Sequence, residues 1–400
     1  MSLWRLSLRY GWSRPLVAAL NLTLLALGLA SITFVLLTSA QLERAFDRDL
    51  AGIDLVVGAK GSPLQLILAG VFHIDVPPGN IALTDVQALQ AHPQVAQVIP
   101  LSLGDSFRGF RIVGTSLDYP AHYQAALAQG RLWQQPLEAV LGAQVAQATG
   151  MPLAAPFIGA HGLGGGGHEH GDTPYRVVGV LSPCQCVLDR LILTSSESVW
   201  RVHEKAVALD EEDQKVLEAE REITLALIRY RTPMAAVSLP RHVNTTTNMQ
   251  AAAPAIEITR LLGLIGVGTD VLRGFGLVLL FTAGLSVFIG LWNAVNERKA
   301  DLAMLRMLGA PPQRVAGLVL CEALWLAGLA SALGLLLGHG LTSLVGYVLE
   351  GQRSLALTGG QFLASELWVV LAALGVALLA ALIPALNAYR VDAGELLGTR

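Results

Sequence analysis

Four long apolar stretches constrain this chain more than any other feature. A helix needs about 20 consecutive apolar residues to cross the hydrocarbon core of a bilayer. Stretches of this kind occupy residues 16–37, 274–292, 315 to beyond 337, and 367–386. The chain is 53% hydrophobic and only 14% charged, with a mean hydropathy of +0.54, which excludes an ordinary soluble protein. The sequence therefore predicts a membrane protein with four transmembrane helices.

The segment between the first two stretches has a different composition. Residues 41–260 hold most of the prolines and acidic residues and no apolar stretch long enough to span a bilayer. Short β-rich pieces are predicted at 54–57, 95–99, 110–113, 139–141, 175–181, 190–193 and 223–230. Helices are predicted between them at 84–91, with Thr84 as N-cap and Pro93 as the stop, and at 195–203. The fold class predicted is a membrane α-helical fold with an inserted extracytoplasmic α+β domain.

Basic residues near the ends of the apolar stretches predict the orientation, because such residues favour the cytoplasmic side. They are Arg5, Arg9 and Arg14 before the first stretch, Arg298, Lys299, Arg306 and Arg314 between the second and third, and Arg390 and Arg400 after the fourth. We therefore expect a multi-pass membrane protein with these three regions in the cytoplasm and with its large domain and the loop at 350–366 outside. The first stretch lacks an A-x-A-type cleavage site and is read as a retained anchor. The net charge of −3 gives no indication of nucleic-acid binding.

These patterns divide the chain into nine parts. They are a cytoplasmic interfacial helix (1–15), the first transmembrane helix (16–38), the periplasmic α+β domain with its stalks (39–260), a stalk and the second transmembrane helix (261–295), a cytoplasmic helix (296–314), the third transmembrane helix (315–349), a periplasmic loop (350–366), the fourth transmembrane helix (367–387) and a cytoplasmic tail (388–400).

The cytoplasmic segment around residues 293–314 is predicted to be a short amphipathic helix. Its apolar side comprises Leu302, Leu305, Met307 and Leu308, and its basic side comprises Arg298, Lys299 and Arg306. Gly309 and the prolines at 311 and 312 are typical of a helix end. The pattern therefore predicts a short amphipathic helix on one side of the bilayer, between two transmembrane helices.

Two passages carry a family resemblance. The first is the Arg298-Lys299 pair followed by Leu305-Arg306, Leu308, Gly309 and Ala310; the second is the C-terminal run from Pro384-Ala385 through Arg390 and Asp392 to Glu395 and Leu396. Together with the four stretches and the large insert, they resemble ABC transporter permeases of the MacB, LolC and FtsX type. The terminal run departs from the family at Ala393-Gly394, where a proline is more usual.

The resemblance implies a transport subunit that is not itself an enzyme. The sequence lacks a G-x-x-x-x-G-K-[ST] phosphate loop, so ATP and Mg are expected in a separate ABC ATPase subunit. That partner would dock on a coupling helix made by Glu297, Arg298, Lys299, Leu302, Leu305, Arg306, Leu308 and Gly309. ATP-driven motion would then move the periplasmic domain, a mechanism called mechanotransmission, to export or extract a lipoprotein, peptide or other amphiphile.

The other partners implied are membrane lipid, a second copy of the chain or a related permease, and a periplasmic or outer-membrane protein. Two further functions stay open. One is a cell-division-type signalling permease that activates a cell-wall hydrolase. The other is a zinc-linked exporter or sensor.

The zinc alternative depends on a glycine- and histidine-rich loop at residues 160–172. His161, His168 and His170 in this loop, with Cys184 and Cys186 after it, offer imidazole and thiolate ligands that suit zinc. Two cysteines one residue apart are expected to be poorly placed for a mutual disulfide. The glycines favour the opposite interpretation, a solvated loop with incidental histidines, because ordering such a loop costs entropy.

Three smaller features also carry expectations. Glu322 near the start of the third stretch is expected to form an intramembrane ion pair with Arg314 or Arg298. Gly328, Gly334, Gly338 and Gly340 predict close packing against another helix. The apolar passage 64–72, followed by His73 and Asp75, is interpreted either as the core of the outer domain or as a surface for an amphiphilic substrate.

Overall fold

The computed structural model describes residues 7, 15–162, 173–207, 217–218, 220–351 and 357–391. The chain forms two compact units. The helical unit comprises Met1–Glu43 and Leu264–Arg400, and the outer unit comprises Arg44–Gly263. The chain passes from one unit to the other within two continuous helices, α2 (Pro15–Leu50) and α10 (Pro254–Glu297).

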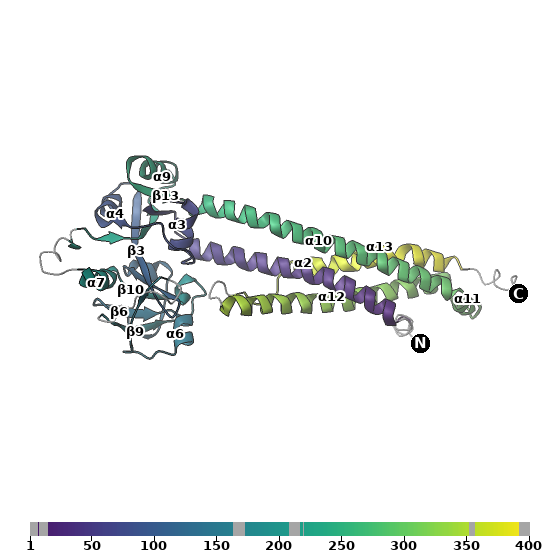
Figure 1. Cartoon of the computed structure of the whole chain (residues 1–400). Coiled ribbons are helices and arrows are strands. Elements are labelled where there is room, and N and C mark those ends of the chain that lie inside the picture. The colour runs from purple at the N-terminus through teal and green to yellow at the C-terminus, as the bar shows by residue number, and fades with distance from the viewer. Residues whose placement is uncertain are drawn as a thin grey trace. The chain divides into compact units, whose positions relative to one another are not determined.

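Four helices in the described residues are long and apolar enough to cross a membrane, as the sequence predicts. They are α2, α10, α12 (Pro312–Gly351) and α13 (Glu366–Tyr389), and the short helix α11 (Lys299–Met307) lies between α10 and α12 (Figure 1). Buried side chains from all four form one apolar cluster.

Small residues set how closely these helices approach. Ala373, Ala377, Ala381 and Ala385 follow one another at i, i+4 spacing along α13, and all are buried. A Cβ atom added at Gly338 of α12 would lie 2.7 Å from Cβ of Thr33 in α2. Lipid-exposed helices gain little from burying apolar surface against each other, so close backbone contact through small residues supplies the attraction. The expected glycine packing is thus confirmed at Gly338.

Not every glycine of α12 serves this purpose. Gly334 also faces α2, where an added Cβ would lie 2.6 Å from Cβ of Leu29. An added Cβ at Gly328 or Gly340 meets no described atom within 4 Å. Of these four glycines, only Gly334 and Gly338 therefore lie at a helix contact within the described residues.

A polar network joins the segment before α13 to the helices around it. The Nδ1 atom of His339 lies 2.6 Å from the carbonyl oxygen of Gly359, and its Nε2 atom lies 3.1 Å from a carboxylate oxygen of Glu366. The side chain of Gln41 donates to the carbonyl of Thr358 and accepts from its amide, at 2.8 and 2.9 Å. These contacts fix the 357–366 segment against α2 and α12, because each buried polar group finds a partner.

The outer unit is built on a mixed β-sheet. Its nine main strands lie in the order β13 (Met249–Ala252), β1 (Leu55–Ala59), β12 (Leu225–Tyr230), β3 (Val95–Phe107), β4 (Phe110–Thr115), β10 (Leu191–Ser195), β6 (Glu138–Leu141), β9 (Tyr175–Leu181) and β5 (Leu127–Gly130). β7 (Pro156–Phe157) pairs with β9, and β8 (Ala160–His161) pairs with β3. β11 (Glu222–Ile223) and β2 (Ile81–Ala82) form a separate pair. The β10–β4 and β6–β9 pairs are parallel, and the others are antiparallel.

Helices cover the two halves of the sheet separately. α4 (Leu83–Gln90) and α9 (Ala235–Thr246) contribute side chains to an apolar core with β1, β3, β12 and β13. α6 (Ala143–Thr149) and α7 (Ser196–Val207) contribute to a second core with β4, β6, β9 and β10 (Figure 1). Two short helices, α3 (Pro63–Gly70) and α5 (Asp118–His122), and the 3-10 turn η1 (Val187–Arg190) complete the unit. The α+β class is confirmed.

Some local predictions are wrong. The helix predicted at 84–91 begins at Leu83 with Ala82 as its N-cap, so Thr84 lies inside the first turn rather than capping it. The sequence analysis also missed α9, because Pro240 within it is typical of a helix break. It missed β13 because the run Met-Gln-Ala-Ala has no β-branched residue.

The apolar passage at 64–72 belongs to the core of the outer unit. Leu66 and Ile67 in α3 are fully buried, and so is Val71 after it. Nε2 of the buried His73 lies 2.9 Å from the hydroxyl oxygen of Tyr119. The core interpretation is therefore correct for this passage, and the interpretation as a substrate surface is not.

The packing at Gly338 predicts a position-specific effect on stability. Gly338→Val should lower the thermal midpoint of the detergent-solubilised chain, because its side chain would overlap Thr33 and overpacking costs about 1–3 kcal/mol. Gly340→Val, two residues away on the same helix, is the matched control and should leave the midpoint nearly unchanged. Equal midpoints for the two variants at one scan rate would contradict this packing.

The buried His73 predicts a pH effect. Burial, with the neighbouring Arg111 and Arg190, holds the pKa of His73 well below 6.5. The unfolded chain therefore binds a proton that the folded chain excludes, so stability is lost as the pH falls below about 6.5, by up to about 1.4 kcal/mol per pH unit. His73→Asn removes this group while keeping a residue type that tolerates the left-handed backbone at this position (φ +55°). Its thermal midpoint should fall less between pH 6.5 and 5.5 than that of the wild type; parallel curves would refute the assignment.

Candidate functional site

The predicted coupling segment forms two helical pieces rather than one. α10 continues to Glu297, Arg298 leaves helical geometry as the N-cap of α11, and α11 itself covers only Lys299–Met307. Gly309 follows with φ +93°, the left-handed conformation that glycine adopts at a helix end. The predicted helix end is confirmed, whereas the single helix across 296–314 is not, because Arg298 departs from helical geometry (φ −96°, ψ 14°).

α11 has one buried and one exposed apolar face. Leu302 is 3% exposed and joins the apolar cluster of the helical unit, and Leu305 packs against that cluster. Met304, Met307 and Leu308 are 53%, 56% and 85% exposed. Their i, i+3, i+4 spacing puts them on one side of the helix. The sequence analysis grouped Leu302 and Leu305 with Met307 and Leu308 and overlooked Met304; the structure divides these residues between two faces.

The charged residues of the segment also point in different directions. Glu297 and Lys299 are exposed. Arg306 donates to the carbonyl oxygen of Val391, at 2.7 Å, just after α13 ends. Arg306 therefore ties α11 to the end of the last helix and is not a freely presented basic group.

Arg298 lies against α12. One of its guanidinium nitrogens is 3.7 Å from a carboxylate oxygen of Glu322, and both side chains are largely buried. Either Arg314 or Arg298 was expected from the sequence to be the partner of Glu322. Arg314, the second residue after Pro312, has an exposed side chain. The pair in the structure is therefore Glu322 with Arg298.

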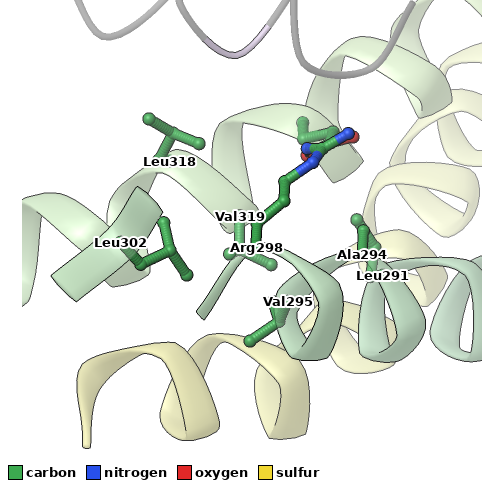
Figure 2. A pocket seen from close by; sticks show the side chains of 8 residues that line it. Leu291, Ala294, Val295, Arg298, Leu302, Leu318 and Val319 are labelled. Atoms are coloured by element: carbon green, nitrogen blue, oxygen red, sulfur yellow. The ribbon is translucent and has the colours of Figure 1, made fainter. Parts of the chain in front are cut away.

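A small pocket adjoins this ion pair. Figure 2 shows the Arg298 side chain among apolar side chains of α10, α11 and α12. The pocket is lined by Leu291, Ala294, Val295, Arg298, Leu302, Leu318, Val319 and Glu322 and has a volume of about 10 Å³. That space holds about one water molecule, so the pocket is a packing feature and not a substrate site.

The outer unit contains a second polar cluster, made by Asp105, His161 and His203. One ligand atom from each residue lies within 4.8 Å of the others. His161 Nδ1 is 3.1 Å and His203 Nε2 is 3.7 Å from Oδ1 of Asp105. Asp105 lies in β3, His161 in β8 and His203 in α7, three elements that are far apart in sequence. Among the expected zinc ligands that the structure describes, His161 belongs to this cluster, whereas Cys184 and Cys186 do not.

The other expected zinc ligands have different outcomes. Cys184 and Cys186 form a disulfide with each other, so the expectation that they are poorly placed for a bond is wrong, and they are not thiolate ligands. The backbone between them bends at Gln185, whose φ is +56°, and this bend brings the two Cβ atoms together. His168 and His170 lie outside the described residues.

Asp105 and His203 were missed because their signals are weak in a single sequence. Asp105 is an acidic residue inside a largely buried strand, a pattern that indicates a pairing partner but does not identify it. His203 is more than 40 residues from His161, so no ligand spacing links them. The pairing of β8 with β3 brings Asp105 opposite His161.

Comparison with known families covers almost the whole chain. Residues 18–238 match the family described as MacB-like periplasmic core domain, and residues 273–393 match FtsX-like permease C-terminal. The first match alone spans more than half of the chain. A comparison with curated protein sequences finds no match.

Two solved structures show a likeness to the outer unit at low sequence identity. The crystal structure of the periplasmic region of MacB from Actinobacillus actinomycetemcomitans is 14% identical, with a TM-score of 0.36, and the match covers 54% of this chain and 95% of that chain. The extracellular domain of a noncanonic ABC-type transporter, YknZ, from Gram-positive bacteria is 13% identical, with a TM-score of 0.31, covering 49% of this chain and 98% of that chain.

The family assignment rests on the two sequence matches, and the four long apolar helices and mixed α+β unit agree with it. The chain belongs to the MacB/FtsX-type permease family, the multi-pass membrane subunits of ABC-type transporters that carry a MacB-like periplasmic core domain.

Proposed function

We propose that this permease couples ATP hydrolysis in a separate ABC ATPase subunit to motions of its outer unit by mechanotransmission. The ATPase docks on α11, the chain acts as a dimer with a second copy of itself in the bacterial inner membrane, and the outer unit works in the periplasm. The substrate class that suits such a machine is a lipoprotein, peptide or other amphiphile.

The observation that carries this proposal is the exposed face of α11. Met304, Met307 and Leu308 present apolar side chains next to the charged Lys299 and Glu297. Methionine adapts to irregular surfaces, and an amphipathic helix with anchors at i, i+3 and i+4 fits a groove on a partner protein. Because these side chains lie beyond the end of α10 and before α12, the bilayer core does not account for their exposure.

The buried face of α11 supports the proposal that motion passes from the docked ATPase to the membrane-spanning helices. Leu302 packs into the helical cluster, Arg298 pairs with Glu322 of α12, and Arg306 holds the chain just after α13. α11 follows α10 after a single non-helical residue. A push on α11 therefore acts on α10, α12 and α13 together, because packed interiors transmit displacement instead of absorbing it.

Two continuous helices, α2 and α10, connect the helical unit to the outer unit. α2 extends to Leu50 and α10 begins at Pro254, so each has residues in both units without a break in the helix. A continuous hydrogen-bonded helix carries an axial or tilting motion along its length. Motion of the spans would thus reach the outer unit without a channel through the helices.

The exposed face predicts a docking defect. Met304→Glu with Leu308→Glu should abolish co-purification with the co-expressed ATPase subunit, because each change places a charge in an apolar contact. Neither side chain is needed for the fold, so the variant should keep the wild-type thermal midpoint.

The matched control is Met234→Glu, which changes an equally exposed methionine of the outer unit (70% exposed) and should leave the complex intact. Pull-down of the ATPase at wild-type yield by the Met304 and Leu308 double variant would remove the docking assignment.

The Arg298–Glu322 pair predicts a loss of both stability and coupling. Arg298→Ala removes the cation beside a buried carboxylate and should destabilise the chain by about 3 kcal/mol, measured by thermal unfolding in detergent. Transport-coupled ATPase activity of the reconstituted complex should fall with it.

Arg314→Ala removes a nearby exposed arginine and should change neither quantity. Adding Glu322→Gln to Arg298→Ala should recover part of the lost stability, because the buried charge is then absent. If the Arg314 variant proves the more damaging of the two, the pairing is wrong.

A further inference from the structure

The Asp105, His161 and His203 cluster has the geometry of a metal site. Zn–N and Zn–O bonds of about 2.0–2.2 Å in a tetrahedron place neighbouring ligand atoms roughly 3.3–3.6 Å apart. The Oδ1 atom of Asp105 lies 3.1 Å from His161 Nδ1 and 3.7 Å from His203 Nε2, which brackets that spacing. The imidazole rings of the two histidines have centroids 5.1 Å apart and are tilted by 45°, so they are not stacked face to face.

A backbone contact orients His203 for this role. Its Nδ1 atom lies 2.7 Å from the carbonyl oxygen of Val199, one turn earlier in α7. A carbonyl only accepts hydrogen bonds, so Nδ1 carries a proton, and Nε2, on the side of Asp105, is the nitrogen available to bind a metal. Histidine ligands of metals usually have their second nitrogen held in this way.

The other two ligands stand on a rigid strand pair. His161 in β8 lies directly opposite Asp105 in β3 in the antiparallel register. The amide of Gly162 donates to the carbonyl of Gly104 at 2.9 Å, and Ser106 Oγ donates to the carbonyl of Gly162. The positions of the two side chains are thus set by backbone hydrogen bonds, which lowers the entropy cost of assembling a site.

The surroundings of Asp105 are unusual for a plain surface ion pair. Its side chain is only 2% exposed. Tyr175 of β9 is fully buried, and its hydroxyl has no hydrogen-bond partner among the described residues. Burial and, to a lesser extent, the charge of Asp105 raise the pKa of this tyrosine.

The cluster has a route to solvent. His203 lines a groove of about 710 Å³ beside α7, β3 and β11, and the side chain of His161 is 47% exposed. A cation can therefore reach the ligand atoms without unfolding the sheet. Three protein ligands with one open side match zinc sites that take a water or an outside group as the fourth ligand.

We propose that Asp105, His161 and His203 bind one Zn²⁺ in the outer unit, with an open coordination position towards solvent. Two imidazoles and one carboxylate form a ligand set that zinc takes in sites with an open position. The ion joins α7 to the β3–β8 pair, and it makes the position of α7 depend on zinc. This site is separate from α11 and does not depend on the proposed ATPase coupling.

The test is zinc titration of the full chain, purified in detergent after treatment with a chelator, by calorimetry with Zn²⁺ alone. We expect Asp105→Asn and His203→Ala each to lose one equivalent of bound zinc per chain, or to bind it at least about 100-fold more weakly. Added Zn²⁺ should raise the thermal midpoint of the wild type, because a ligand that binds the folded state stabilises it, and should not raise that of either variant.

His242→Ala is the matched control. His242 is also near a second histidine, His92, with ring centroids 5.4 Å apart, so its loss tests whether any histidine pair of the outer unit binds zinc. This variant should bind zinc as the wild type does. His161→Ala supplies a variant at an exposed position in case the buried Asp105→Asn chain does not fold.

Two results would overturn the proposal. One is zinc stoichiometry and affinity unchanged in both Asp105→Asn and His161→Ala, as expected if only the histidines at 168 and 170 bind the ion. The other is no zinc-dependent change in the wild-type thermal midpoint at saturating Zn²⁺. A tetrahedral Co²⁺ absorption spectrum that disappears in His203→Ala would confirm the ligand set.

Discussion

The contacts of α11 with its neighbours are the constraint on which the proposed mechanism depends. Leu302 in an apolar cluster, Arg298 with Glu322 and Arg306 with the carbonyl of Val391 are three contacts of different chemistry on one short helix. An isolated helix of nine residues is unstable in water, so α11 exists because these tertiary contacts hold it. The same contacts leave Met304, Met307 and Leu308 exposed. One face of α11 thus holds the helix in the bundle, and the other is the face to which we assign ATPase docking.

The arrangement of the spans follows from the same reasoning. Alanines of α13 and Gly334 and Gly338 of α12 allow close approach, while the exposed large side chains of these helices face outward. Such packing relies on shape instead of the hydrophobic effect. An added Cβ would meet Thr33 at Gly338 and no described atom within 4 Å at Gly340, so the close packing is specific to one face of α12.

Much of this fold could be predicted from the sequence, because its strongest signals are local. Spans of 20 apolar residues and β-rich runs such as Tyr175–Leu181 depend on neighbouring residues only. The residues of the candidate sites were harder to predict. Which arginine meets Glu322 depends on the turn at Arg298, and the two faces of α11 depend on which residues the bundle covers. Asp105 and His203 meet only through strand pairing and helix packing, which one sequence does not reveal.

The Cys184–Cys186 disulfide depends on a local turn that the spacing of the two cysteines does not reveal. Asp189 accepts hydrogen bonds from the amides of Cys184 and Gln185, at 3.0 and 2.7 Å, and these bonds shape the turn that closes the Cys184–Cys186 bridge. Spacing alone argues against that bridge, but the turn at Gln185 makes it geometrically accessible.

The end of α2 is hydrogen-bonded to the same turn. Arg48 donates to the carbonyl of Gln185, and a carboxylate oxygen of Asp49 accepts from the amide of Val187 at 3.0 Å. Tyr123 donates to the carbonyl of Asp49 at 2.8 Å, and the ring of Phe46 packs edge-on against Phe72. The last turn of α2 is thus bonded to the sheet domain by charge, backbone and aromatic contacts. The proposed mechanism needs such an attachment, because a loose joint at the end of α2 would absorb a displacement before it reached the sheet.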